Sequence, residues 1–208
     1  MNLPNKLSLS RIVIVTIMLL GLFVLSFFNL DPIYLGNSKI NLIYFIVFVV
    51  FFMAAFTDYL DGHLARKYNL ITDLGRFLDP IADKLLVNSL IIFLIVTPSY
   101  AAGNISFSLW CVILLIMRDL IVDALRLIAI SNNKVIAANI FGKIKTVLQM
   151  VAISFVLLNN WPFSYFDQSF PVGLKITNLI IYLATLVSLI SGIIYLIENR
   201  HVFKKDEK

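Results

Sequence analysis

The sequence is poor in charge and nearly free of cysteine. Only 14% of its 208 residues are Asp, Glu, Lys or Arg, whereas 60% are apolar. The mean hydropathy of +0.93 is too high for a soluble domain. The single cysteine, Cys111, lies in an apolar segment and excludes an intramolecular disulfide. Repeats, low-complexity segments and the alternating polarity of membrane barrel strands are also absent.

What the sequence does contain is a series of uncharged apolar runs, most of them as long as the roughly 17–25 residues of a membrane-spanning helix. A backbone in lipid must satisfy its own hydrogen bonds, so these runs predict an all-α, polytopic membrane protein with six transmembrane helices in one domain, residues 1–208. The predicted helices are Ile12–Phe28, Asn41–Tyr68, Leu74–Val96, Leu109–Ala129, Ile140–Leu158 and Val172–Asn199. The first lacks a signal-peptide cleavage site and is expected to be retained, with Ser8 or Ser10 as its N-cap.

Positive charge is distributed unevenly over the ends of these helices. Six spans place both termini on one side, and that side holds Lys6, Arg11, Arg66, Lys67, Arg76, Lys134, Lys143, Lys145, Arg200, Lys204 and Lys205. The opposite loops hold only Lys39 and Lys175. The positive-inside rule therefore predicts that both termini and the acidic stretch between the second and third helices are cytoplasmic. Lys6 and Arg11 are expected to act as topogenic charges, with contact to lipid phosphates as the alternative.

Acidic residues concentrate between two of the apolar runs. Five of the chain's 12 Asp and Glu residues lie in this stretch, namely Asp58, Asp61, Asp73, Asp79 and Asp83. A carboxylate in a membrane segment costs about 2.5–3.5 kcal/mol at the helix centre, so it indicates a functional site. Residues three or four apart share a helix face, which pairs Asp58 with Asp61 and Asp79 with Asp83. Asp73 falls in the turn and is expected to cap the next helix.

Four carboxylates facing one point repel one another unless a cation compensates. Mg²⁺ or Mn²⁺ suits such oxygen ligands, and two ions are able to clamp a phosphoryl group during in-line displacement. A glycine in a helix costs roughly 0.5–1 kcal/mol relative to alanine, so Gly62 and Gly75 are expected to have a function. Without side chains, they leave room for a phosphorylated ligand. The alternative is a set of solvated aspartates in ordinary ion pairs with Arg66, Arg76 and Lys84.

The spacing of this stretch resembles the signature of the CDP-alcohol phosphatidyltransferases. The matching positions are Asp58-x-x-Asp61-Gly62-x-x-Ala65-Arg66, eight further residues, and Gly75-x-x-x-Asp79-x-x-x-Asp83. The resemblance implies a homodimer whose cytoplasm-facing site binds two divalent cations through its four aspartates. It also implies that Asp83 is the general base, and that CDP-diacylglycerol is bound by Asp58, Gly62, Ala65, Arg66 and Gly75.

Four cations on the fourth and fifth predicted helices bear on the acceptor alcohol. Arg118 and Arg126 are about 80° apart around a helix, and Lys143 and Lys145 begin the next one. Intramembrane cations are costly unless paired or bound to a ligand, so all four predict a pocket for an acceptor phosphate. Neutralisation by the aspartates of the fourth helix is the alternative.

Three further segments resemble bacterial phosphatidylglycerophosphate synthases, a branch of the same family. These segments are Asn2–Arg11, Arg118–Arg126 and Gly142–Thr146. The resemblance implies sn-glycerol 3-phosphate as the acceptor and a bacterial plasma membrane as the location. One departure is Asp119, where the family commonly has Glu. The negative charge is kept, but the side chain is shorter.

The predicted function is transfer of a phosphatidyl group from CDP-diacylglycerol to sn-glycerol 3-phosphate, with release of CMP. Inositol phosphate, serine and phosphatidylglycerol are alternative acceptors. A divalent-cation transporter is the alternative from another class, but the aspartates lie at helix ends among basic residues and no inverted repeat is visible. The expected partners are the two substrates and membrane lipids, with no nucleic acid.

Overall fold

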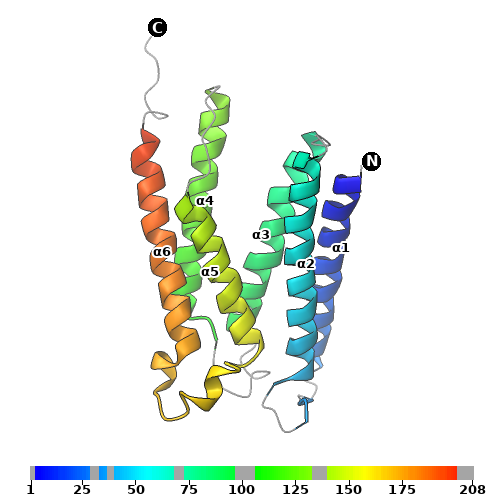
Figure 1. The fold of residues 1–208 in the computed structure, drawn as a ribbon, viewed down its shortest axis with the longest axis vertical. Coiled ribbons are helices and arrows are strands. Elements are labelled where there is room, and N and C mark those ends of the chain that lie inside the picture. Colours follow the sequence, from blue (N-terminus) through cyan, green and yellow to red (C-terminus); the bar gives the residue numbers. More distant parts are fainter. Residues whose placement is uncertain are drawn as a thin grey trace. The chain divides into compact units, whose positions relative to one another are not determined.

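Six α-helices make up most of the part of the chain that the structure describes (Figure 1). The computed structural model describes residues 3–28, 33–36, 40–67, 73–96, 106–132 and 140–200, without the side chains of 3–5, 7, 59–67, 73–77, 79, 80, 96 and 131. The helices are α1 (Leu3–Phe27), α2 (Leu42–Lys67), α3 (Asp73–Val96), α4 (Leu109–Ser131), α5 (Ile140–Leu157) and α6 (Ile176–Glu198), with short 3-10 turns η2 (Phe163–Tyr165) and η3 (Val172–Leu174). They form two compact units: unit 1 holds residues 1–104 and 157–161, and unit 2 holds 105–156 and 162–208.

Each predicted helix is present, and the larger differences lie at two N-termini. α1 begins at Leu3 instead of Ile12, since Pro4 is tolerated in a first helical turn and the polar residues after it continue the helix. Ser8 and Ser10 therefore lie inside α1, and their prediction as N-caps is wrong. α6 begins at Ile176 because the preceding residues form η3.

The helices belong to a membrane protein. Three segments are long and apolar enough to cross a bilayer, namely Ser8–Phe27 in α1, all of α5 and all of α6. In α2 the apolar part, Leu42–Asp58, is shorter. α3 and α4 are long enough at 24 and 23 residues, but both contain several charged side chains. The all-α membrane class is confirmed, while the count of six spans stays a prediction.

In unit 1, α1 packs against both α2 and α3. The start of α1, the end of α2 and the start of α3 lie at the same end of this unit (Figure 1). Away from that end, the rings of Tyr44 on α2 and Phe93 on α3 meet edge to face, with centroids 6.3 Å apart. Asn41 caps α2, because its Oδ1 accepts a hydrogen bond from the backbone N–H of Ile43 at 2.8 Å. The motif-bearing ends of α2 and α3 therefore lie beside the N-terminal part of α1.

In unit 2, α4 and α6 pack side by side and run in the same direction (Figure 1). The buried face of α6 is rich in small and polar residues: Thr177, Asn178, Ile181, Ala184, Thr185, Ser188, Ser191, Gly192 and Tyr195. Apart from Glu198 at its end, its exposed residues are large and apolar, for example Leu183, Leu186 and Ile193. This arrangement is typical of lipid-embedded helices, whose association depends on close packing and hydrogen bonds because lipid is as apolar as their side chains.

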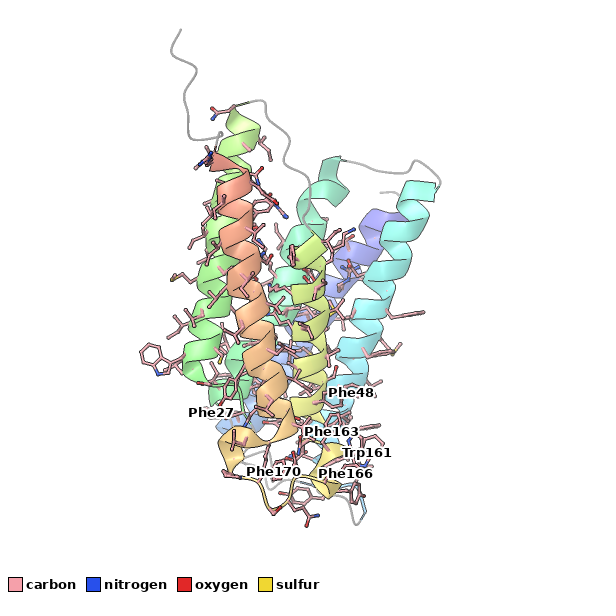
Figure 2. The ribbon with its side chains drawn as sticks, turned by 60° about the vertical axis from the view of Figure 1, so that its left-hand side comes forward. Phe27, Phe48, Trp161, Phe163, Phe166 and Phe170 are labelled. Atoms are coloured by element: carbon pink, nitrogen blue, oxygen red, sulfur yellow. The ribbon has the colours of Figure 1, made fainter. Side chains whose placement is uncertain are left out.

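The connection from α5 to α6 lies at the end of unit 2 where α6 begins. The carboxylate of Asp167, which is buried, accepts a hydrogen bond from the N–H of Ile176 at 3.0 Å and so caps α6. Phe163, Phe166 and Phe170 gather in this connection (Figure 2). Phe166 and Phe170 are exposed, which is compatible with a position where the helices leave the lipid.

Candidate functional site

The signature positions fall on two helices of unit 1. The last turns of α2 contain Asp58, Asp61, Gly62, Ala65 and Arg66, and α3 contains Gly75, Asp79 and Asp83. Only the side chains of Asp58 and Asp83 are among those that the structure describes, and both are partly buried. The predicted roles of the other six positions, and of Asp73 as a cap, concern side chains outside the described ones.

Asp58 forms an ion pair with Arg11 of α1. The Arg11 side chain is only 3% exposed, whereas that of Asp58 is 42% exposed. The predicted contact of Arg11 with lipid phosphates is therefore wrong, because the guanidinium points inward to a carboxylate. A basic residue at the edge of an apolar run serves equally as a topogenic charge or as a buried partner. Sequence reasoning therefore missed Arg11 as part of this site.

The carboxylates of unit 1 fit a hard divalent cation by their chemistry. Asp58 already attracts a cationic group, and Asp83 lies on the neighbouring α3. Among the described side chains, no cluster of three or more His, Cys, Asp or Glu is close enough to hold a metal. The side chains of Asp61 and Asp79, which would complete the set, are not among those that the structure describes. The donor type thus suits Mg²⁺ or Mn²⁺.

Unit 2 contains a second group of charged residues, called here the basic cluster: Arg118 and Asp119 of α4, Lys145 of α5 and Ser191 of α6. Lys145 Nζ donates to both carboxylate oxygens of Asp119, at 2.8 and 2.7 Å. Arg118 donates from Nη1 to Asp119 Oδ1 at 3.0 Å and from Nη2 to Ser191 Oγ at 2.7 Å. Three helices of unit 2 are therefore joined by hydrogen bonds at one point.

The basic cluster has more positive than negative charge. Its side chains are largely buried, with Arg118 11%, Asp119 13% and Lys145 7% exposed. Two cations and one carboxylate leave a net charge of +1 (+1 +1 −1) on these three residues. The Nε atom of Arg118 is also buried and has no hydrogen-bond partner in the described part of the chain. The predicted neutralisation by Asp119 is thus present, while the part predicted for Asp123 stays untested; the buried Nε atom of Arg118 is what favours an anionic ligand.

Arg126 and Lys143 lie outside the basic cluster, although the sequence grouped them with Arg118 and Lys145. Arg126 is exposed and donates from Nε to Tyr195 Oη at 3.1 Å, and its guanidinium carbon lies 5.6 Å from the Tyr195 ring centroid. Like Arg118 it reaches α6, as expected for two arginines on one face. The Lys143 side chain is exposed at the start of α5.

Comparison with known proteins identifies the family of this chain. The sequence model of the CDP-alcohol phosphatidyltransferases matches residues 1–194. A Bacillus subtilis protein named CDP-diacylglycerol–glycerol-3-phosphate 3-phosphatidyltransferase is 37% identical over 98% of this chain and 97% of its own length. Proteins with the same name from Mycoplasma pneumoniae (38%, covering 93% and 86%) and Rickettsia felis (31%, covering 93% of each) are also similar. The chain belongs to the CDP-alcohol phosphatidyltransferase family.

Proposed function

We propose that this protein transfers the phosphatidyl group of CDP-diacylglycerol to sn-glycerol 3-phosphate, forming phosphatidylglycerophosphate and CMP. The main support is the name shared by relatives that are 31–38% identical over 93–98% of the chain. The two largely buried cations of the basic cluster and the unpartnered Nε of Arg118 are independent support, because this acceptor carries a phosphate whereas serine carries none.

Unit 1 is proposed to bind the nucleotide end of CDP-diacylglycerol. The family generally uses divalent metal ions, and we propose two, Mg²⁺ or Mn²⁺, held by Asp58, Asp61, Asp79 and Asp83. When bound, such ions offset negative charge on the diphosphate and on the departing CMP. For the nucleotide we propose Asp58 together with Gly62, Ala65, Arg66 and Gly75, whose small members leave room for it.

Asp83 is proposed as the general base. An alcohol is a weak nucleophile, so the carboxylate takes the hydroxyl proton as the oxygen attacks the phosphorus that bears the diacylglycerol. A new P–O bond forms to the acceptor and the P–O bond to CMP breaks. Asp83 is partly buried on α3, one turn beyond Asp79, which suits a group that works beside the diphosphate.

The basic cluster is proposed to bind the acceptor phosphate. Arg118 and Lys145 are its inner ligands, since both are largely buried and both contact the carboxylate of Asp119. Guanidinium and ammonium groups in such surroundings form strong, charge-assisted hydrogen bonds with phosphate. Arg126 and Lys143, being exposed, are proposed to attract the anion from a distance.

The proposed location of the protein at the membrane follows from the chemistry of its substrates. CDP-diacylglycerol has a polar nucleotide and two acyl chains, so the protein is proposed to work at the cytoplasmic surface of the plasma membrane, with six spans and both termini in the cytoplasm. We also propose that residues 1–208 act as a single domain and that the protein is a homodimer.

The activity can be tested with purified protein, CDP-diacylglycerol, Mg²⁺ and labelled glycerol 3-phosphate. The expected result is labelled phosphatidylglycerophosphate with an equal amount of CMP. Product formed only with serine, inositol phosphate or phosphatidylglycerol would overturn the acceptor assignment. Mg²⁺ flux into liposomes without nucleotide, in the absence of any lipid product, would favour a transporter.

A further inference from the structure

Arg118 lies directly against the backbone of α6 at Gly192. A Cβ atom added to Gly192 would stand 2.9 Å from Cγ of Arg118, 3.5 Å from its Nε and 3.7 Å from its Cδ. The first distance is too short for two carbon atoms, so any side chain at position 192 would displace the stem of Arg118. Glycine weakens a helix interior, and the close approach of Arg118 gives a reason for its presence here.

The residue before this glycine holds the far end of the same side chain. Ser191 is fully buried, and its Oγ accepts a hydrogen bond from Nη2 of Arg118 at 2.7 Å. On the other side, Asp119 accepts one from Nη1 at 3.0 Å. A guanidinium is planar and rigid, so two bonds at its tips and a close contact along its stem define its orientation.

We propose that Ser191 and Gly192 are positioning residues that orient Arg118 toward the phosphate of the acceptor and so set the affinity for that substrate. The inference rests on the proposed function, and it assigns to α6 a part in substrate selection that the sequence did not indicate. The two residues act through Arg118 and need no contact with substrate. Their influence should therefore fall on the acceptor and not on CDP-diacylglycerol.

The chain offers a matched control for each substitution. Ser188 lies three residues before Ser191 on α6, is fully buried, and its hydroxyl has no partner among the described residues. Gly21 of α1 is a helical glycine whose added Cβ would meet nothing within 4 Å. Ser188→Ala and Gly21→Ala therefore repeat the chemical changes without removing a hydrogen bond of Arg118 or crowding its side chain.

The test is steady-state kinetics of Arg118→Ala, Ser191→Ala, Gly192→Ala and both controls, varying each substrate in turn. Losing one charge-assisted hydrogen bond should raise the KM for glycerol 3-phosphate about tenfold in Ser191→Ala, and displacing the arginine should raise it at least as much in Gly192→Ala. The KM for CDP-diacylglycerol should stay within about twofold of wild type, and both controls should match wild type.

A double variant separates positioning from general damage. In an Arg118→Ala background, Ser191→Ala should add no further rise in KM, because the side chain that it orients is gone. If Ser191→Ala still raised the KM for glycerol 3-phosphate in the Arg118→Ala background, the inference would be overturned. An equal rise in the KM values of both substrates would overturn it as well. If Gly192→Ala does not fold, Ser191→Ala decides the matter alone.

Different results would refute the positioning role of Ser191 and Gly192 and the proposed function. Wild-type protein that makes no phosphatidylglycerophosphate would refute the function. Inorganic phosphate then serves as the probe: it should raise the Tm of wild type, less so that of Ser191→Ala, and not that of Arg118→Ala. Equal protection of wild type and Ser191→Ala by phosphate would refute the positioning role itself.

Discussion

The guanidinium of Arg11, buried on α1, is paired with the carboxylate of Asp58, the first aspartate of the signature, on α2. The pair joins the N-terminal helix to the proposed metal site. A cation in this place balances the charge of Asp58, and it would compete with a metal ion at the proposed site for the same oxygen.

Replacing Arg11 with Gln should therefore have two opposite effects. Without metal, the Tm should fall, because Asp58 loses its partner. With metal, the Mg²⁺ concentration for half-maximal activity should fall about fivefold, corresponding to about 1 kcal/mol for a partly exposed pair. Lys6→Gln is the control, since Lys6 is an exposed cation on the same helix. A higher Mg²⁺ requirement in Arg11→Gln would show that Arg11 supports metal binding instead.

Asp83→Asn should abolish turnover while binding of CDP-diacylglycerol remains measurable. The amide keeps the shape of the side chain but accepts no proton, and a general base typically contributes a factor of about 10²–10⁴. Turnover is measured as CMP release, and binding as the rise in Tm with CDP-diacylglycerol. Asp73→Asn, at the start of α3 and outside the signature, should retain activity. Near-normal turnover in Asp83→Asn would rule it out as the base.

Asp119→Asn should destabilise the protein by about 3–5 kcal/mol, because two largely buried cations lose their common counter-charge. The net charge of Arg118, Lys145 and residue 119 would rise from +1 to +2. Inorganic phosphate should then raise the Tm of the variant more than that of wild type. Asp119→Glu keeps the charge and should restore most of the stability. Equal phosphate protection of Asp119→Asn and wild type would argue against anion binding here.

The four cations proposed to bind the acceptor phosphate should differ in their effect on the KM for glycerol 3-phosphate. Arg118→Ala and Lys145→Ala should each raise the KM for glycerol 3-phosphate about 10- to 100-fold, since each removes a largely buried ligand. Arg126→Ala and Lys143→Ala should raise it less than about fivefold, and this effect should vanish at high salt because both side chains are exposed. The ratio of KM values at two salt concentrations checks this order. Rises in KM that are equal for all four variants and independent of salt would contradict the predicted order.

Asp167→Ala should lower stability by about 1–2 kcal/mol and leave the acceptor KM unchanged. Its carboxylate caps α6 through the N–H of Ile176, at the end of unit 2 far from the basic cluster along that helix. Gln168→Ala is the neighbouring, exposed control. Thermal unfolding and kinetics measured on the same preparations would separate the two effects. A changed acceptor KM in Asp167→Ala would link this cap to the substrate site.

Most of the helical structure could be predicted because it depends on local chemistry. A run of apolar residues long enough to cross lipid has to be helical, and proline or polar turns mark where it stops. The predicted α4 and α5 thus agree with the structure within two residues at each end. Errors arose where a polar segment continued a helix, as before Ile12, since nothing in its hydropathy shows that the helix starts at Leu3.

The sequence by itself determined the family and the proposed chemistry, because the signature aspartates and glycines stand at fixed spacings along the chain. It also placed Arg118 and Arg126 on one helix face. Only the tertiary structure decided which cations share a carboxylate, and that Arg118 lies against Gly192. Periodicity shows which residues share a face within one helix. Which face meets which neighbouring helix depends on packing between segments distant in sequence, and no local pattern records that choice.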